Sequence, residues 1–154
     1  MNARNVEVML EIFAAIEGRD AARFAELVQP DVELHWPPSL QYGGSTAGPE
    51  PDGPTWGSTW LPLQPGPAER RMDPRIVAAS DDEVVVLWRQ RGLSPSGERI
   101  DSPVLGLYRL RDGRLARAQM FYFDPVSVGA FIAAASRPEP AGPPVPGSAS
   151  RPDA

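Results

Sequence analysis

Apolar positions in the first quarter of the chain recur at helical spacing. They repeat every three or four positions over residues 6–16, which predicts an amphipathic helix. Gly18 follows as a typical helix-ending residue. Asp20 is placed to cap a second helix, and Pro30 ends that helix. Residues 31–36 then predict a short strand, so two helices precede the first strand.

The second half of the chain has the pattern of β-strands. Runs rich in β-branched and aromatic residues, separated by turn residues, predict strands joined as antiparallel hairpins over residues 70–79, 83–93, 99–110 and 115–123. Pro74 indicates that the first of these strands lies at an edge or carries a bulge. Asp124 before Pro125 predicts a capped final helix. Helices segregated from an antiparallel sheet define an α+β fold. A curved sheet that helices close on one side would form a cone with a cavity at its open end.

Proline and glycine interrupt this pattern in two places. Eight of the 19 prolines and six of the 14 glycines lie in residues 37–67, where we expect an irregular insert. The last segment combines six more prolines with few apolar residues, so residues 136–154 are predicted to be a disordered Pro-rich tail. Residues 1–135, insert included, are then one domain of ordinary size.

Composition and charge exclude several classes of protein. The chain has no Cys and one His, which excludes disulfides, thiolate nucleophiles and His-rich metal sites, and we expect neither a metal nor a cofactor. All 15 basic residues are Arg, which together with abundant Ala and Pro indicates a GC-rich coding bias. The net charge of −5 argues against nucleic-acid binding. No apolar run approaches the roughly 20 residues of a membrane span, and no signal-peptide pattern begins the chain. We therefore expect a cytoplasmic protein that engages neither nucleic acid nor membrane.

Three segments resemble the SnoaL-like branch of the nuclear-transport-factor-2-like superfamily. They are residues 31–36 with Tyr42-Gly43, residues 104–115, and Tyr122-Phe123-Asp124 leading into the last helix. The resemblance covers about residues 5–135. It implies a cone-shaped curved antiparallel sheet wrapped around N-terminal helices, the cystatin-like α+β barrel, and a homodimer formed through the outer face of the sheet. Relatives include polyketide cyclases, a steroid isomerase, epoxide hydrolases, dehydratases and binding modules, so the fold alone does not select a reaction.

The sequence departs from the catalytic patterns of these relatives. The usual catalytic carboxylate lies on the last strand, three residues before its terminal Asp, and here that position is Phe121. The epoxide hydrolase branch uses an Arg and an Asp two residues apart on a middle strand. The nearest match, Arg89-Gln90-Arg91, has no Asp, and Arg99-Ile100-Asp101 lies one strand later. Both departures count against a direct copy of either mechanism.

Two arginines on a middle strand are candidates for binding an oxyanion. Strand alternation gives Leu87, Arg89 and Arg91 one face, and the family register implies that this face lines the cavity. There the two guanidinium groups would hold an anionic or enolate-like oxygen. The alternative is a structural ion-pair network with Asp101 or Asp73.

The last strand and the end of the first strand supply further candidates. Gln119 shares a face with Phe121 and Phe123, where its amide would orient a carbonyl within an apolar wall. His35 is the one imidazole in the chain and is the general-base candidate if it points inward. Trp36 points the opposite way, and the sequence leaves open which of the two faces in.

Asp101 is the second acid–base candidate, with a salt bridge to Arg89, Arg91 or Arg117 as the alternative. A set of aromatic residues is predicted to contact the substrate: Tyr42, Trp56, Trp60, Trp36, Phe121, Phe123 and Tyr108. The first three lie in the Pro/Gly-rich insert, which predicts a hydrophobic lid over a flat ligand. The alternative is that they pack on the outer sheet or at a dimer interface.

These features together predict a cofactor-independent acid–base enzyme of natural-product biosynthesis. It would be a cyclase, isomerase or dehydratase acting on a hydrophobic, oxygenated substrate of polyketide or terpenoid type. His35 or Asp101 would move a proton next to a carbonyl, and the two arginines, Gln119 or Tyr42 would stabilise the oxyanion. Phe121 at the usual carboxylate position motivates a second hypothesis, a non-catalytic ligand-binding or structural dimeric accessory protein. An epoxide hydrolase is the third.

Overall fold

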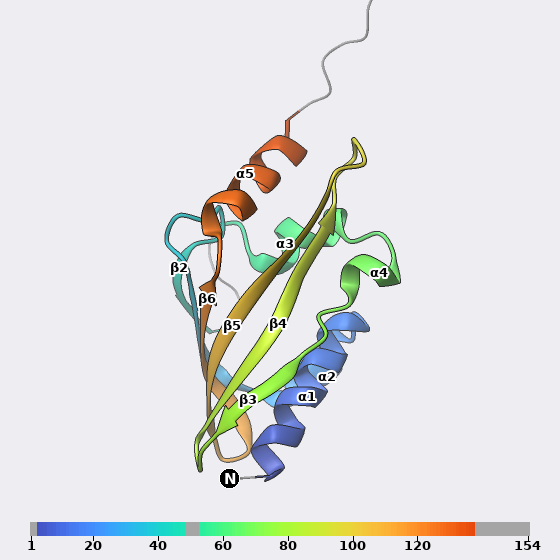
Figure 1. Cartoon of the computed structure of the whole chain (residues 1–154). Coiled ribbons are helices and arrows are strands. Elements are labelled where there is room, and N and C mark those ends of the chain that lie inside the picture. Colours follow the sequence, from blue (N-terminus) through green and yellow to red (C-terminus); the bar gives the residue numbers. More distant parts are fainter. Residues whose placement is uncertain (1–2, 49–52, 138–154) are drawn as a thin grey trace, which may run out of the picture.

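The computed structural model describes residues 3–48 and 53–137, and their elements confirm the predicted α+β class (Figure 1). In chain order they are α1 (Ala3–Glu17), α2 (Ala21–Leu27), β1 (Val28–Trp36), β2 (Gly44–Ala47), α3 (Trp56–Trp60), the 3-10 turn η1 (Leu61–Leu63), α4 (Pro67–Arg70), β3 (Arg75–Ala79), β4 (Glu83–Leu93), β5 (Arg99–Arg111), β6 (Arg114–Tyr122) and α5 (Pro125–Ala135). All but the first two residues of the predicted disordered tail lie outside the described residues.

The strands form one curled six-stranded sheet in the order β2-β1-β6-β5-β4-β3. Strands β3 to β6 pair antiparallel with their neighbours, as the hairpin pattern predicted. The sheet is not antiparallel throughout, because β1 lies parallel to β6 and places His35 beside Gln119 in the register. The parallel pair is possible because a long stretch of chain separates the two strands.

Helices close the concave side of this sheet (Figure 1). Helix α1 presents an apolar face at the predicted spacing and buries Val8, Met9, Ile12 and Phe13. Asp20 caps α2 by accepting a hydrogen bond from the backbone N–H of Arg23. None of the helices in residues 3–48 and 53–137 is long and apolar enough to cross a membrane.

The alternation of β4 runs opposite to the predicted facing. Its buried residues, Val84, Val86, Trp88 and Gln90, point toward the helices. The predicted cavity-lining set of Leu87, Arg89 and Arg91 therefore lies on the outer face. A regular strand can bury either of its two alternate sets of side chains. In this fold the buried set of β4 is the one without arginines, so both guanidinium groups stay hydrated.

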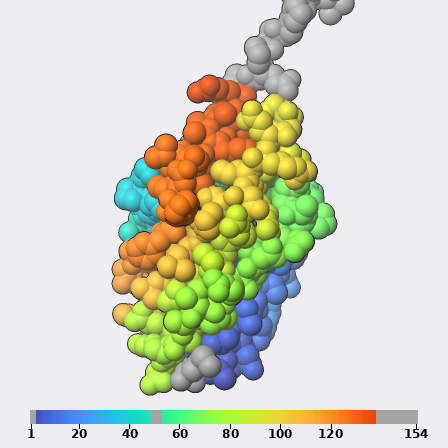
Figure 2. Space-filling model, in the orientation of Figure 1, coloured from blue at the N-terminus to red at the C-terminus, as the bar shows by residue number. Residues whose placement is uncertain are grey.

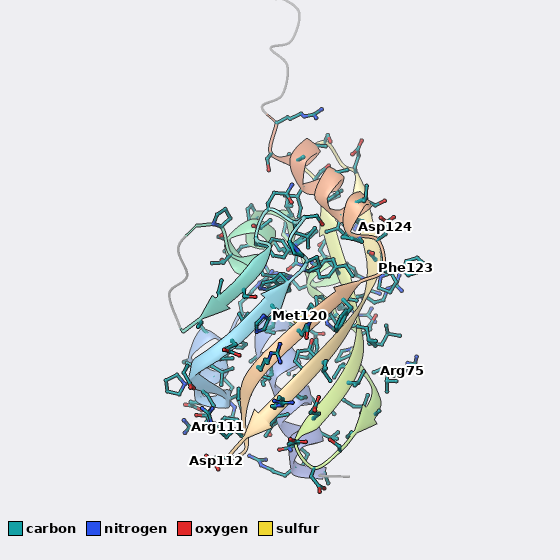
Figure 3. The ribbon with its side chains drawn as sticks, turned by 90° about the vertical axis from the view of Figure 1, so that its left-hand side faces the viewer. Arg75, Arg111, Asp112, Met120, Phe123 and Asp124 are labelled. Atoms are coloured by element: carbon teal, nitrogen blue, oxygen red, sulfur yellow. The ribbon has the colours of Figure 1, made fainter. Side chains whose placement is uncertain are left out.

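The facing predicted for β6 is also wrong, since Met120 and Tyr122 point inward and Gln119 and Phe121 point outward. Phe123, just after the strand, is 83% exposed and projects away from the body of the molecule (Figure 3). Residues paired across a sheet share a face, and Met120 pairs with the buried Gly106 of β5. The pairing register across the whole sheet thus determines which side chains of each strand point inward.

The insert at residues 37–67 is more ordered than expected. It contains β2, α3 and η1, and α4 begins at its last residue. Helix α3 starts at a capping box in which Thr55 and Ser58 exchange side-chain and backbone hydrogen bonds. The predicted strand over residues 70–79 begins only after Pro74, at Arg75, and β3 is an edge strand as that proline indicated.

Candidate functional site

A chain of hydrogen bonds joins five side chains in the space between the sheet and α3. We call it the aromatic network, and it consists of Tyr42, Trp56, Trp60, Gln90 and Tyr122. The Trp60 indole N–H donates to the Tyr42 hydroxyl (3.1 Å), which lies 2.7 Å from the Tyr122 hydroxyl. Tyr122 donates to Gln90 Oε1 (3.4 Å), and the Trp56 indole N–H donates to the same oxygen (2.6 Å). With Tyr42 donating to Tyr122, the bonds converge on the Gln90 carbonyl.

Close packing fixes the end of this network that Tyr42 and Trp60 form. Tyr42 sits in a turn that only glycine can complete, because a Cβ on Gly43 would lie 2.3 Å from the Pro37 carbonyl oxygen. The Trp60 ring fills a recess over Gly92, where a Cβ would lie 2.7 Å from its Cζ3 atom. Trp60 also stacks on Phe131 of α5, with ring centroids 6.1 Å apart. The aromatic network is therefore held by the helices as well as by the sheet.

Burial keeps the tyrosine hydroxyls of the network neutral. It raises the pKa of Tyr42 to about 12, against smaller opposing effects of the hydrogen bonds with Tyr122 and Trp60. Burial and the neighbouring Tyr42 raise the pKa of Tyr122 well above its ordinary value. Both groups are therefore hydrogen-bond donors at neutral pH, suited to holding a carbonyl or enolate oxygen rather than to removing a proton.

Two further aromatic candidates also face inward. Trp36 packs edge-on against Tyr42, with ring centroids 5.2 Å apart, which answers the question of whether Trp36 or His35 points into the core. Tyr108 packs edge-on against Phe13 and lies over Gly106, where a Cβ would meet its hydroxyl oxygen at 2.2 Å. Of the seven predicted substrate contacts, five are thus inside the fold, and Phe121 and Phe123 are outside.

Three of the predicted catalytic residues form an ion-pair cluster on the outer face. Asp101 accepts from Arg89 Nε (2.8 Å) and lies 3.3 Å from Arg91 Nε, and Arg91 also pairs with Asp73 (2.8 Å). Burial alone would raise the pKa of Asp101, but the hydrogen bonds from Arg89 and Arg91 hold it below its ordinary value. This arrangement matches the structural ion-pair alternative.

His35 also points outward, because Trp36 takes the inner position at the end of β1. Its Nδ1 lies 2.6 Å from the Ser45 hydroxyl, and its Nε2 lies 3.7 Å from a Glu33 carboxylate oxygen. His35, Gln119 and Phe121 border an open depression of about 270 Å³ at the junction of β1 and β6. The structure thus brings these three candidates together from the outer face of the sheet, and Trp36, Met120 and Tyr122 line the same depression.

Sequence reasoning missed two residues of the network, Tyr122 and Gln90. Gln90 is fully buried and is the shared acceptor for Trp56 and Tyr122. The sequence did contain a signal for it, because Gln90 shares a face of β4 with Trp88 and Gly92, and a polar amide in such a set is a candidate site residue. Among the described residues, no group of three or more His, Asp or Glu side chains is placed to hold a metal ion.

Comparison with known proteins identifies the family. The sequence profile of the SnoaL-like domain matches residues 6–118. The chain belongs to the SnoaL-like family. A search of proteins with curated descriptions finds no match.

Solved structures share this SnoaL-like fold at low sequence identity. A protein of unknown function with a cystatin-like fold from Xanthomonas campestris superposes with a TM-score of 0.68 at 22% identity, covering 82% of this chain and 96% of that one. TerC, co-crystallized with polyporic acid, gives 0.63 at 21% identity, covering 84% and 98%. A protein assigned as a SnoaL-like polyketide cyclase from Jannaschia sp. CCS1 gives 0.62 at 19% identity, covering 88% and 94%.

Proposed function

We propose that this SnoaL-like protein is a cofactor-independent enzyme of the cyclase, isomerase or dehydratase type. Its substrate would be a hydrophobic, oxygenated small molecule of polyketide or terpenoid type. The observation that carries the proposal is the chain of neutral hydroxyl donors from Tyr42 through Tyr122 to Gln90 inside an aromatic wall. The likeness to a SnoaL-like polyketide cyclase and to TerC with polyporic acid supports this substrate class.

The proposed chemistry is polarisation of a carbonyl group by a tyrosine hydroxyl. Tyr122 or Tyr42 turns its single O–H from its partner in the aromatic network to the ketone oxygen, and this hydrogen bond strengthens as the adjacent C–H bond breaks and its electrons form the enolate. Among residues 3–48 and 53–137, Glu69 is the one buried charged side chain, and it pairs with Arg99 (2.8 Å). The departing proton therefore passes to water, and the enolate carbon is free to attack a second carbonyl or to be protonated elsewhere.

Hydrogen–deuterium exchange of the α-protons of tetralone, a two-ring ketone, tests this chemistry without knowledge of the natural substrate. Exchange is followed by NMR in D2O with the full chain at catalytic concentration. Tyr122→Phe and Tyr42→Phe remove one hydroxyl each, and we expect the rate to fall by about 10²-fold. His35→Gln and Asp101→Asn, on the outer face, are the matched controls and should leave the rate unchanged. Retained exchange in both tyrosine variants, or loss in the controls, would contradict the assignment.

A non-catalytic ligand-binding protein is the second candidate function. The observation that favours it is that the aromatic network contains no carboxylate or imidazole to serve as a base. Saturable binding of tetralone with no exchange above that of buffer would support this candidate and exclude the enzyme.

We also propose that a second copy of the chain covers the outer face of the sheet, which Figure 2 shows as a continuous surface of β-strands and α5. Leu105, Phe121 and Phe123 are exposed there. The surrounding charges are neutralised within the chain, for example Arg89 by Asp101, so two such faces meet without net repulsion. Sedimentation should show a dimer that Phe121→Glu dissociates. Leu61→Glu, at another exposed apolar residue, is the control, and a monomeric wild type would refute the proposal.

A further inference from the structure

The indole of Trp56 forms one end of the aromatic network, at the Gln90 carbonyl on which its bonds converge. Its N–H donates to Gln90 Oε1 at 2.6 Å, the shortest bond in the network. Gln90 is fully buried, whereas Trp56 is only partly buried. The indole therefore stands between solvent and the amide, in the position that a molecule entering from outside would reach first.

The Gln90 amide is only half satisfied by this arrangement. A primary amide carries an acceptor oxygen and two N–H donors. The oxygen accepts from Trp56 and Tyr122, but the Nε2 group has one contact, at 3.5 Å, with the carbonyl of the next residue, Arg91. That distance is at the outer limit of a hydrogen bond. An indole N–H has no acceptor to offer, so the buried donors of Gln90 stay without a good partner.

The attachment of Trp56 allows it to leave without disturbing the rest of the fold. It is the first residue of α3, a helix of five residues, which is too short to be stable without tertiary contacts. The other end of α3 is held by Trp60, which is completely buried in the recess over Gly92 and stacked on Phe131. Rotation of the short helix about Trp60 would free the Gln90 site while Trp60 keeps its contacts.

We propose that Trp56 is an intramolecular stand-in for the ligand, and that a fused-ring aromatic phenol displaces it. Such a ligand reproduces what the indole presents, a flat ring system with one hydrogen-bond donor at its edge. Its hydroxyl group also accepts, so it donates to Gln90 Oε1 and receives the Nε2–H that the indole leaves unpaired. This inference rests on the proposed function for the location of the site, and it adds the chemical class of the ligand and the residue that must move.

Calorimetric titration with naphthol tests the displacement directly. Naphthol is a two-ring phenol, and naphthalene and methoxynaphthalene are matched probes that lack the donor. We expect the full-length wild type to bind naphthol and Trp56→Ala to bind it about 10- to 100-fold more tightly, because no buried indole and hydrogen bond must be removed first. Trp56→Phe, which keeps a ring but loses the N–H, should lie between them. Leu61→Ala, at an exposed residue of the adjoining turn, is the control and should match the wild type.

The role of the amide is tested in the opened variant. In Trp56→Ala, naphthol should bind about tenfold more tightly than either probe, and adding Gln90→Leu should abolish that preference. Equal naphthol affinity in wild type and Trp56→Ala, or equal binding of naphthol and naphthalene in Trp56→Ala, would overturn the inference. Far-UV circular dichroism and thermal unfolding of each variant ensure that only folded protein is compared.

The tetralone assay separates this inference from the proposed function. If Trp56→Ala does not raise the naphthol affinity but tetralone exchange is normal, the stand-in role is refuted and the proposed enzymatic function stands. A gain of naphthol affinity in Trp56→Ala, without exchange in any variant, would support the stand-in role in a protein that only binds its ligand.

Discussion

The recess that receives Trp60 offers a sharp test of how the insert is anchored. A Cβ built on Gly92 would lie 2.7 Å from Trp60 Cζ3 and 3.2 Å from Phe131 Cε1. Carbon atoms in contact prefer about 3.5–4.0 Å, so Gly92→Ala places its methyl group about 1 Å too close to the indole. The backbone of Gly92 is ordinary strand, so the clash is the only reason that alanine is disfavoured there.

The magnitudes follow from these contacts. Gly92→Ala should reduce the free energy of unfolding by about 1–3 kcal/mol, the usual cost of overpacking a core. Trp60→Ala removes a fully buried ring and should cost about 3–5 kcal/mol. Once the indole is absent, the Gly92 methyl group has room, and alanine is the better strand residue by about 0.5–1 kcal/mol. The double variant should then be more stable than Trp60→Ala alone, and the sum of the two effects gives a coupling energy of about 1.5–4 kcal/mol.

Urea unfolding followed by far-UV circular dichroism measures all four members of this cycle, because that signal does not depend on the tryptophan removed. Gly57→Ala is the matched control, since its Cβ would meet only Thr55 Oγ1, at 3.8 Å, and it should be neutral or stabilising. Additivity of the two single changes within about 0.5 kcal/mol would refute the placement of Trp60 over Gly92.

Three further predictions concern charge, titration and packing. Because its arginine partners lower the pKa of Asp101, its contribution to stability is present above the ordinary carboxyl pKa of about 4 and is lost as the pH falls through the lower folded value. Asp101→Asn should therefore reduce the fall in melting temperature as the pH is lowered below about 4, whereas Asp112→Asn in the exposed hairpin turn should not. Burial raises the pKa of all three tyrosines, that of Tyr42 to about 12, so absorbance titration should show phenolate near pH 10 only in unfolded protein. The stability that this burial of neutral tyrosine gives is complete below pH 10 and is lost as the pH rises through about 12. Gly106→Ala should cost about 1–3 kcal/mol in urea unfolding, because its methyl group would overlap the buried Tyr108 ring.

Elements defined by local pattern were predicted closely. The strands expected over residues 83–93, 99–110 and 115–123 differ from β4, β5 and β6 by at most one residue at each end. Turn residues and period-two alternation are properties of neighbouring positions, so strands can be predicted from them without knowledge of the fold. The insert was less well predicted, although Trp56 and Trp60, four residues apart, carried a helical signal that its prolines and glycines obscured.

Which side chains face the interior could not be obtained in the same way. Val84, Val85, Val86, Leu87 and Trp88 are all apolar, so both faces of β4 satisfy the pattern over that stretch. A shift of one residue exchanges the two faces, and pairing across the sheet rather than local sequence makes the choice. The pairing that forms places Arg89, Arg91, His35 and Gln119 on the outer face of the sheet, not on the inner face that was predicted for the two arginines and Gln119.

The sequence by itself determined the order of the elements, the α+β class and the family, because these depend on periodicity, turn chemistry and short segments of residues. Only the tertiary structure decided the candidate site. Tyr42, Trp60, Gln90 and Tyr122 lie far apart in the chain, and they meet because β4, β5 and β6 share one register and α3 folds back over the sheet. Long-range pairing of this kind leaves no mark in the local pattern of any one segment, which is why the partners of the buried amide became visible only in the folded chain.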